Sequence, residues 1–317
     1  MSSKRSAYGY GAGLRWKKII LNVLLVAILL VILSLIPVSY FKLKGQNGNE
    51  RRDLRESYQT GAFEAVYTKS GELLREKPLD SFLLTINGFS AYELAIAQIN
   101  SFNMLSYIDN CIWSLRKALL FRENVSDGRI YYVLGKAYYY KGAGYADLAV
   151  RFLEKARNVS YKAGDIPEYL GLAYANIRDY RSSVAAFSMA LTGDGGYPVA
   201  NPSDILLLSI ARSYMALEED DPARAYLIRC LDISKDSRTI AAARLILGNM
   251  MLKSGDLEGA EAEYLKVIDE NGESAEAHFQ LGELYAAGGD TTRARAEWRR
   301  VLRIDPAYGP ARNRLNL

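Results

Sequence analysis

Aromatic and cationic side chains gather in one short stretch of the chain. Tyr132, Tyr139 and Tyr140 surround Lys136 in the sequence. Rigid aromatic rings beside a cation are the side-chain types that most often anchor one protein on another. The pattern therefore predicts a protein-binding surface. The alternative is that these tyrosines only pack between helices, and the 23 tyrosines of the chain leave that interpretation open.

The residue types used in catalysis and metal binding are scarce. The chain has one histidine, His278, and two cysteines. A Ser–His or Cys–His pair would need that histidine beside a nucleophile, and metal sites usually need several such ligands. The glycine-rich runs at 8–13 and 193–196 lack the strand context or the Lys-Ser/Thr ending of nucleotide-binding loops. We therefore expect a protein that is not an enzyme, with no cofactor, metal ion or small-molecule substrate, and with His278 as a packing or surface residue.

The formal charge of +4 divides unevenly along the chain. Residues 1–44 hold seven Lys/Arg and no acid, so the remaining 273 residues carry 33 basic and 36 acidic groups, a net of −3. A nucleic-acid site needs a broad positive field with aromatic side chains, which this body does not supply. We expect no nucleic-acid partner. One group of arginines is interpreted as a solvated helix face, or as a contact for an acidic patch of a partner or another subunit: Arg293, Arg295, Arg299, Arg300 and Arg303.

A short pattern recurs along the body of the chain. Leu-Gly, followed three residues after the glycine by Tyr or Met, occurs in YVLGKAYYYKG, EYLGLAYANIRDY, LILGNMMLKSGDL and FQLGELYAAGGDT. Gly or Ala takes the same place at positions 88, 135, 171, 211, 248 and 282, with steps of 47, 36, 40, 37 and 34 residues. A period near 34 is typical of helical hairpins that stack, because one hairpin cannot bury its apolar face alone.

These segments resemble the tetratricopeptide repeat (TPR) family, in which Leu-Gly-x-x-Tyr lies in the first helix of a hairpin and small residues flank an aromatic in the second. The last full repeat matches best, with Leu281, Gly282, Tyr285, Ala294, Trp298, Val301 and Pro306. The resemblance implies an all-α fold, an α-solenoid of five clear hairpins and about two degenerate ones. The small residue at the Leu-Gly site would allow close helix approach. Cys111 and Cys230 fall at second-helix positions that suit buried free thiols.

The resemblance also implies a binding surface. In TPR proteins the first helices line an inner groove, at about the second, fifth, ninth, twelfth and thirteenth repeat positions. Projected onto this chain, the candidate protein-binding residues are Arg129, Tyr132, Lys136, Tyr139, Tyr140, Arg212, Asn249 and Lys253. Chaperone-binding members hold a carboxyl-terminal carboxylate with a Lys/Asn/Arg clamp. Leu245 stands where the clamp lysine would be expected, which argues against that function here.

An apolar segment precedes the repeats. Residues 19–36, IILNVLLVAILLVILSLI, contain no charge over 18 positions and end at Pro37. A helix of this length spans roughly 27 Å, close to the hydrocarbon thickness of a bilayer. A cleavable signal peptide would have a shorter apolar stretch and a small-residue cleavage site, which residues 37–41 do not provide. We expect an uncleaved transmembrane anchor in contact with the lipid bilayer.

The charges beside the apolar segment bear on its orientation. Arg15, Lys17 and Lys18 abut the segment with no acid nearby, which favours a cytoplasmic amino terminus. Basic residues also follow on the other side, from Lys42 onward, so a bare count does not decide. We favour the inner (cytoplasmic) membrane, a single pass and an extracytoplasmic, periplasmic body. The expected domains are a cytoplasmic tail 1–18, an anchor 19–36, a linker 37–46, degenerate TPR-like hairpins 47–127, a TPR solenoid 128–308 and the carboxyl-terminal end of a capping helix 309–317.

Taken together, these features predict a membrane-tethered TPR scaffold or adaptor within a cell-envelope complex, similar to the membrane-anchored TPR proteins of bacterial envelopes. Its expected partners are other proteins of a membrane-associated complex, with self-association as a further option. Two alternatives stay open. One is a structural subunit of a large periplasmic assembly, such as a flagellar-motor collar. The other is a cytosol-facing import or chaperone receptor.

Overall fold

The computed structural model describes residues 48–98, 100–121, 127–193 and 202–316. Within these ranges every regular element is a helix, so the expected all-α fold is confirmed there. The predicted tail, anchor and linker lie outside the described residues. None of the helices that the structure describes is long and apolar enough to cross a membrane.

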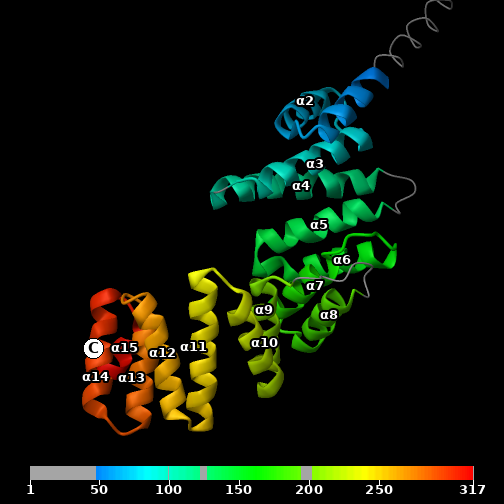
Figure 1. Ribbon diagram of the computed structural model, residues 1–317. Helices are drawn as coiled ribbons and strands as arrows, with labels where there is room; N and C mark the ends of the chain where they lie inside the picture. Colours follow the sequence, from blue (N-terminus) through cyan, green and yellow to red (C-terminus); the bar gives the residue numbers. More distant parts are fainter. Residues whose placement is uncertain (1–47, 99, 122–126, 194–201, 317) are drawn as a thin grey trace, which may run out of the picture.

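The helices pair into antiparallel hairpins that stack in series into a curved solenoid (Figure 1). The first hairpin joins a helix over residues 48–59 to α2 (Phe63–Glu76). The six that follow are α3 (Ser81–Ile96) with α4 (Ser101–Leu120), α5 (Gly128–Lys141) with α6 (Ala146–Asn158), α7 (Ile166–Asn176) with α8 (Tyr180–Thr192), α9 (Asp204–Ala216) with α10 (Asp220–Ile233), α11 (Ser237–Ser254) with α12 (Leu257–Glu270), and α13 (Ala275–Ala287) with α14 (Thr291–Ile304). The short helix α15 (Gly309–Leu315) covers the last hairpin, and a single turn, η1 (Ala143–Tyr145), joins α5 to α6.

Local signals in the sequence set where these helices begin and end. Gly255 ends α11 with φ of 86°, in the left-handed region where glycine carries no side-chain penalty. The carboxylate of Asp256 then accepts a hydrogen bond from the Gly259 backbone N–H at 2.9 Å and so caps α12. Aspartate side chains cap five further helices: Asp80, Asp127, Asp179, Asp236 and Asp290.

In the four hairpins that carry the Leu-Gly pattern, its glycine lies against a large side chain of the second helix. A β-carbon placed on Gly135 would be 2.5 Å from Leu153 Cγ and 3.0 Å from the Leu153 backbone nitrogen. A β-carbon on Gly282 would be 2.5 Å from Nε1 of Trp298. The two helices of a hairpin therefore approach at a distance that only glycine or a yielding neighbour permits, as the repeat pattern predicts.

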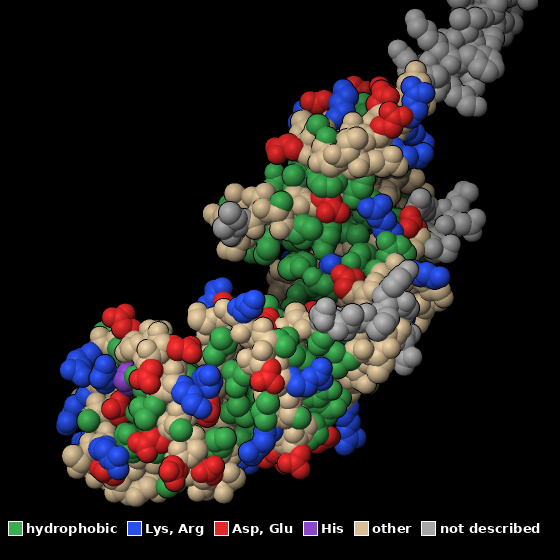
Figure 2. Space-filling model, in the orientation of Figure 1, with side chains coloured by type: hydrophobic (Ala, Val, Ile, Leu, Met, Phe, Trp, Pro, Cys, Tyr) green, Lys and Arg blue, Asp and Glu red, His purple; other side chains and the backbone are tan. Residues whose placement is uncertain are grey.

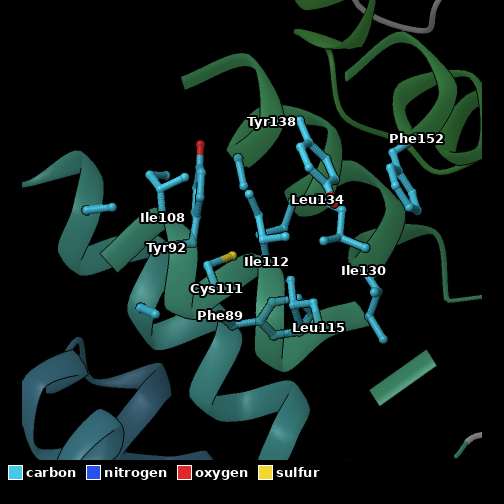
Figure 3. Packing of buried hydrophobic residues seen from close by; sticks show 14 of the residues in the cluster. Phe89, Tyr92, Ile108, Cys111, Ile112, Leu115, Ile130, Leu134, Tyr138 and Phe152 are labelled. Atoms are coloured by element: carbon cyan, nitrogen blue, oxygen red, sulfur yellow. The ribbon is translucent and has the colours of Figure 1, made fainter. Parts of the chain in front are cut away.

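The apolar core continues from one hairpin to the next. Its largest cluster joins α3, α4, α5 and α6 and includes Phe89, Leu115, Leu134 and Phe152 (Figure 3). Cys111 is buried in the same cluster, its thiol is free, and burial raises the pKa of that thiol. Each hairpin thus shares its core with its neighbours, which is how stacked repeats reach a stable size.

The first helices of the hairpins form the inner surface of the solenoid. They contact each other directly from α3 to α5, α5 to α7, α7 to α9, α9 to α11 and α11 to α13. Among the described helices, no pair of second helices packs together to that extent. The stack therefore closes on the side of the first helices and opens on the other side. We call the surface made by α3, α5, α7, α9, α11 and α13 the inner surface.

A buried polar network joins the two amino-terminal hairpins. The side-chain amide of Asn87 on α3 donates to the Ser70 hydroxyl of α2 at 2.9 Å, and the Asn87 carbonyl accepts from Ser114 of α4 at 3.0 Å. All three residues are buried. One asparagine thus satisfies two hydroxyl groups that have no access to water.

Replacing Asn87 by alanine should therefore lower the free energy of unfolding by about 2–3 kcal/mol, because the buried Ser114 hydroxyl loses its acceptor and the Ser70 hydroxyl loses a donor. Urea denaturation followed by circular dichroism measures this loss. The matched control is Asn110→Ala on the exposed face of α4, where we expect a change within about 0.5 kcal/mol. Equal losses in both variants would show that the network does not hold these hairpins together.

Candidate protein-binding surface on the inner helices

The aromatic and cationic residues predicted on α5 meet side chains of α3 and α7. Lys136 lies near the ring of Tyr92 on α3, and Tyr139 and Tyr140 contact Tyr169 on α7. All of these helices are first helices of their hairpins, so the group lies on the inner surface. We call Tyr132, Tyr139, Tyr140 and Tyr169 the tyrosine cluster.

Lys136 is held among the rings of this cluster. Its Nζ lies 4.3 Å from the ring centroid of Tyr169 and 5.1 Å from that of Tyr132. The same ammonium donates to Asp165 Oδ2 at 2.8 Å, and the Tyr132 hydroxyl donates to Asp165 Oδ1 at 2.8 Å. The Lys136 side chain is only 12% exposed. This cation therefore joins α5 to α7 and is not offered to a partner.

The rings of Tyr139, Tyr140 and Tyr169 form an array that remains half-buried. The Tyr139 and Tyr169 rings meet edge to face, with centroids 5.2 Å apart. The hydroxyls of Tyr140 and Tyr169 share a hydrogen bond of 2.7 Å. Burial raises the pKa of the Tyr139 and Tyr169 hydroxyls, so both are neutral donors at physiological pH. Parts of these rings remain exposed on the inner surface.

Glu168 is a carboxylate beside the cluster that has no ion pair within the described part of the chain. It is half-buried on α7, one residue before Tyr169, and makes no hydrogen bond or ion pair with any other residue that the structure describes. Burial raises the pKa of Glu168, and repulsion from Asp165 adds to this effect, which Lys136 offsets in part. A desolvated carboxylate without a partner attracts a cation from outside the chain.

Arg129 lies one turn before Tyr132 and turns toward the amino-terminal hairpins. Its guanidinium carbon is 4.4 Å from the ring centroid of Phe89 and 5.2 Å from that of Tyr58. It also donates to the Tyr58 hydroxyl at 2.8 Å, which in turn donates to Glu93 at 3.2 Å. Arg129 is thus engaged in packing α5 against the preceding first helices.

The remaining predicted residues lie in other hairpins and do not join the cluster. Arg212 is exposed on α9. The Asn249 carbonyl accepts a hydrogen bond from the buried Tyr264 at 2.6 Å, so it faces the core of its own hairpin. Lys253 lies 3.7 Å from Asp220 at the start of α10. The structure therefore brings together Tyr132, Lys136, Tyr139 and Tyr140, and separates them from Arg212, Asn249 and Lys253.

Three residues of the site were missed by the sequence reasoning: Asp165, Glu168 and Tyr169. Asp165 and Glu168 occupy the second and fifth positions of their repeat, counted from Gly171 as the eighth. The same positions hold Arg129 and Tyr132 in the preceding hairpin, so the repeat spacing indicates both residues. Tyr169 is at the sixth position, which that rule does not include.

The sole histidine has a structural role. His278 is 2% exposed, and its Nδ1 lies 2.6 Å from a Glu297 carboxylate oxygen. Its packing interpretation is confirmed. Cys230 is buried with a free thiol, like Cys111. In the described ranges, no group of three or more His, Cys, Asp or Glu side chains is arranged to hold a metal ion.

The distribution of surface types differs along the solenoid. Figure 2 shows hydrophobic side chains concentrated over α3 to α7, whereas charged side chains are scattered over α11 to α15. The predicted arginine group of α14 belongs to the charged part, where Arg293 pairs with Asp290 at 2.6 Å and four other arginines are exposed: Arg295, Arg299, Arg300 and Arg303.

Tyrosines that donate to carboxylates make the fold sensitive to alkaline pH. Tyr174 donates to Glu154 at 2.9 Å and Tyr285 donates to Glu261 at 2.7 Å. Burial, followed by the bond to the carboxylate, raises the pKa of Tyr174 and of Tyr285 to about 12. In the unfolded chain a tyrosine loses its proton near pH 10. Above that pH the unfolded state binds fewer protons than the folded state, so stability falls as pH rises from about 10 to about 12.

We therefore expect the urea midpoint to fall between pH 9 and pH 11.5. The double variant Tyr174→Phe/Tyr285→Phe should lose less of its midpoint over this interval than the wild type, because two of the titrating hydroxyls are gone. Parallel denaturation series at the two pH values make the comparison. An unchanged slope in the variant would contradict this role of the two hydroxyls.

Comparison with known proteins agrees with this architecture. The tetratricopeptide repeat family model matches residues 275–308, which span the last hairpin. No curated protein matches the sequence significantly. The fold is similar to the carboxyl-terminal part of a TPR repeat-containing protein from Cytophaga hutchinsonii, with a TM-score of 0.57 and 15% identity over 84% of this chain and 100% of that chain.

Two further solved structures share the fold. One is PilW, described as a type IV pilus biogenesis factor, with a TM-score of 0.56 and 18% identity over 72% of this chain and 98% of that one. The other is the Cut9–Hcn1 hetero-tetramer of the APC/C, with a TM-score of 0.51 and 13% identity over 83% of this chain and 47% of that one. The last hairpin thus matches the tetratricopeptide repeat family model, and the described chain has the fold of a TPR-like α-solenoid.

Proposed function

We propose that this protein is a membrane-tethered scaffold that binds a segment of another protein on its inner surface. The observation that carries the proposal is the half-buried ring array of Tyr139, Tyr140 and Tyr169 beside the unpaired carboxylate of Glu168. Aromatic side chains with polar tips are typical anchors of protein interfaces. The array lies on a surface built only from first helices, where an extended segment can cross from α5 to α7.

The charges of the site favour a partner segment that carries a lysine or arginine. Lys136 is already neutralised by Asp165, whereas Glu168 has no such partner among the described residues. A cation beside Glu168 would also lie near the faces of the tyrosine rings, a contact worth about 0.5–2 kcal/mol. Lys136 itself occupies such a site inside the protein, with aromatic rings on one side and a carboxylate on the other.

Photo-crosslinking tests whether a partner protein binds at the tyrosine cluster on the inner surface. p-Benzoylphenylalanine placed at Tyr139 in the full chain, in its native membrane, should form an adduct with one partner protein. The matched control is the same probe at Tyr145, which is 40% exposed near η1 and lies away from the cluster. An adduct of the same mass and yield at Tyr145, or none at Tyr139, would refute the groove as the binding surface.

The membrane tether in this proposal comes from the apolar residues 19–36 and the basic residues before them. We propose a cytoplasmic amino terminus, a single pass through the inner membrane and an extracytoplasmic body that serves a cell-envelope complex. Protease added to intact spheroplasts should digest the body and leave the tail protected. Digestion only after lysis would place the body in the cytoplasm and favour a cytosol-facing receptor.

A further inference from the structure

Large apolar side chains are exposed together at one edge of the second hairpin. Leu79 is 51% exposed, Trp113 57%, Leu120 79% and Phe121 45%. We call these four residues the apolar edge. Exposed apolar residues that occur singly need no explanation, whereas a group of them marks a contact surface. Trp113 and Leu120 are two helical turns apart on α4 and therefore lie on the same face of the helix.

The packing of α3 against α4 places Leu79 in this group. A β-carbon on Gly88 would touch Leu115 and the Cys111 carbonyl, which fixes the antiparallel register of the two helices. In that register the start of α3 lies beside the end of α4. Leu79 comes two residues before α3 begins, and Leu120 is the last residue of α4. Leu79, Leu120 and Phe121 therefore lie at the same end of the second hairpin.

The chain enters the solenoid at this same edge. Arg51 pairs with Asp80 at 2.6 Å, and Lys77 lies 3.8 Å from Glu50. The first described residues of the chain therefore lie beside the turn that carries Leu79. Only residues 37–47 separate them from the apolar segment, and 11 residues reach at most about 40 Å when fully extended. Any membrane that holds residues 19–36 therefore lies within this distance of residue 48, at the end of the first hairpin that adjoins Leu79.

We propose that the apolar edge docks on the surface of the bilayer that holds the anchor. This inference rests on the membrane tether proposed above. Tryptophan, leucine and phenylalanine are the side chains that enter the headgroup boundary, and tryptophan is enriched there. Lys117 lies with its Nζ 4.5 Å from the Trp113 ring centroid, so its ammonium group is placed to reach lipid phosphates while its stem stays on the apolar surface.

Because the chain is tethered to the membrane, a small apolar contact is enough to hold the apolar edge on the bilayer. Four side chains alone would bind a membrane only weakly, but the anchor holds them at high effective concentration beside it. Docking would fix the first two hairpins on the bilayer, so that the solenoid projects from it in one orientation. The inner surface around α5 and α7 would then be presented at a constant height to partners in the same membrane.

Spin labelling of the full chain in nanodiscs of phosphatidylcholine and phosphatidylglycerol tests the docking. A nitroxide is attached at Leu120→Cys, since the native thiols of Cys111 and Cys230 are buried. Oxygen partitions into lipid, whereas a nickel complex stays in water. The ratio of the label's accessibility to oxygen to its accessibility to nickel should be severalfold higher at Leu120 than at the control site. That control is Leu265→Cys on α12, whose native side chain is 40% exposed.

A second variant tests whether the apolar side chains cause the docking. With the label at Leu79→Cys, the added substitution Leu120→Glu should shift the label from the lipid-type to the water-type accessibility, because a carboxylate at the headgroup boundary opposes docking. No shift would overturn the inference.

Three further outcomes would also overturn the docking proposal, and they differ in whether the proposed membrane tether is refuted as well. A Leu120 label as open to nickel as the Leu265 label, in chains that copurify with the nanodiscs, refutes the docking and keeps the tether. Protection of the Leu120 label from both reagents would mean that a protein, or a second copy, covers the edge. Failure of the chain to enter nanodiscs would refute tether and docking together.

Discussion

Replacing Gly135 by valine is expected to lower the free energy of unfolding by about 2–3 kcal/mol, as is typical when a close-packed contact is overfilled. The first carbon of the new side chain would be 2.5 Å from Leu153 Cγ and 3.0 Å from the Leu153 backbone nitrogen. A leucine tip yields by rotation, but a backbone atom in the middle of α6 does not. The two helices must separate, and the gain in helix propensity over glycine, about 0.4 kcal/mol, does not offset that loss.

The effect should also be local in origin. Repeats contact only their neighbours, so a weakened third hairpin uncouples the two hairpins before it from the four after it. Urea denaturation followed by circular dichroism should show an earlier and broader transition. Gly144→Val is the matched control, because a β-carbon there meets nothing within 4 Å and its φ is not positive. Equal stability of the two variants would disprove close approach as the reason for glycine at 135.

Replacing Tyr139 by alanine is expected to weaken binding of the crosslinked partner about thirtyfold, corresponding to about 2 kcal/mol for a central aromatic anchor. Tyr139 is chosen because its hydroxyl makes no bond within the cluster, whereas Tyr140 and Tyr169 hold each other. Titration calorimetry with the purified partner segment measures the affinity. Tyr145→Ala, at an exposed position outside the cluster, should leave it unchanged.

A second variant separates binding from folding. Glu168→Gln removes the unpaired carboxylate whose pKa is raised by burial, so at pH 7 the variant should be as stable as the wild type or slightly more stable. It should nevertheless bind a basic segment about tenfold more weakly, with a smaller dependence on salt. Full affinity in this variant would refute the cation site, and full affinity in Tyr139→Ala would refute the groove.

The repeat pattern predicted the path of the backbone because its residues are determined by contacts between helices that are adjacent in the sequence. The Leu-Gly glycines mark the close contact of two helices that are neighbours in sequence, and Gly255 with Asp256 marks the turn between them. Such contacts recur with the repeat and need no knowledge of distant residues. The same spacing also indicates Asp165 and Glu168, because they precede Gly171 by the same numbers of residues as Arg129 and Tyr132 precede Gly135.

The roles of individual side chains depended on tertiary contacts, both between hairpins and within them. Lys136 and Asp165 are 29 residues apart, and Asn249 meets Tyr264 within its own hairpin. Whether a polar side chain faces solvent or the next hairpin is set by the twist between hairpins, which insertions alter along the stack. For that reason the sequence could identify Lys136 as a site residue but could not show that its charge is already neutralised.

By itself, the sequence determined that this chain is helical, that its helices pair with a period near 34 residues, and that it has one histidine and two cysteines. These properties follow from periodicity and composition, which are local. Only the tertiary structure decided which aromatic rings remain half-buried, that Glu168 beside them has no ion pair among the described residues, and which exposed apolar side chains lie at one end of the second hairpin. Those properties depend on how successive hairpins rotate against each other, because that rotation brings residues of different repeats to one surface.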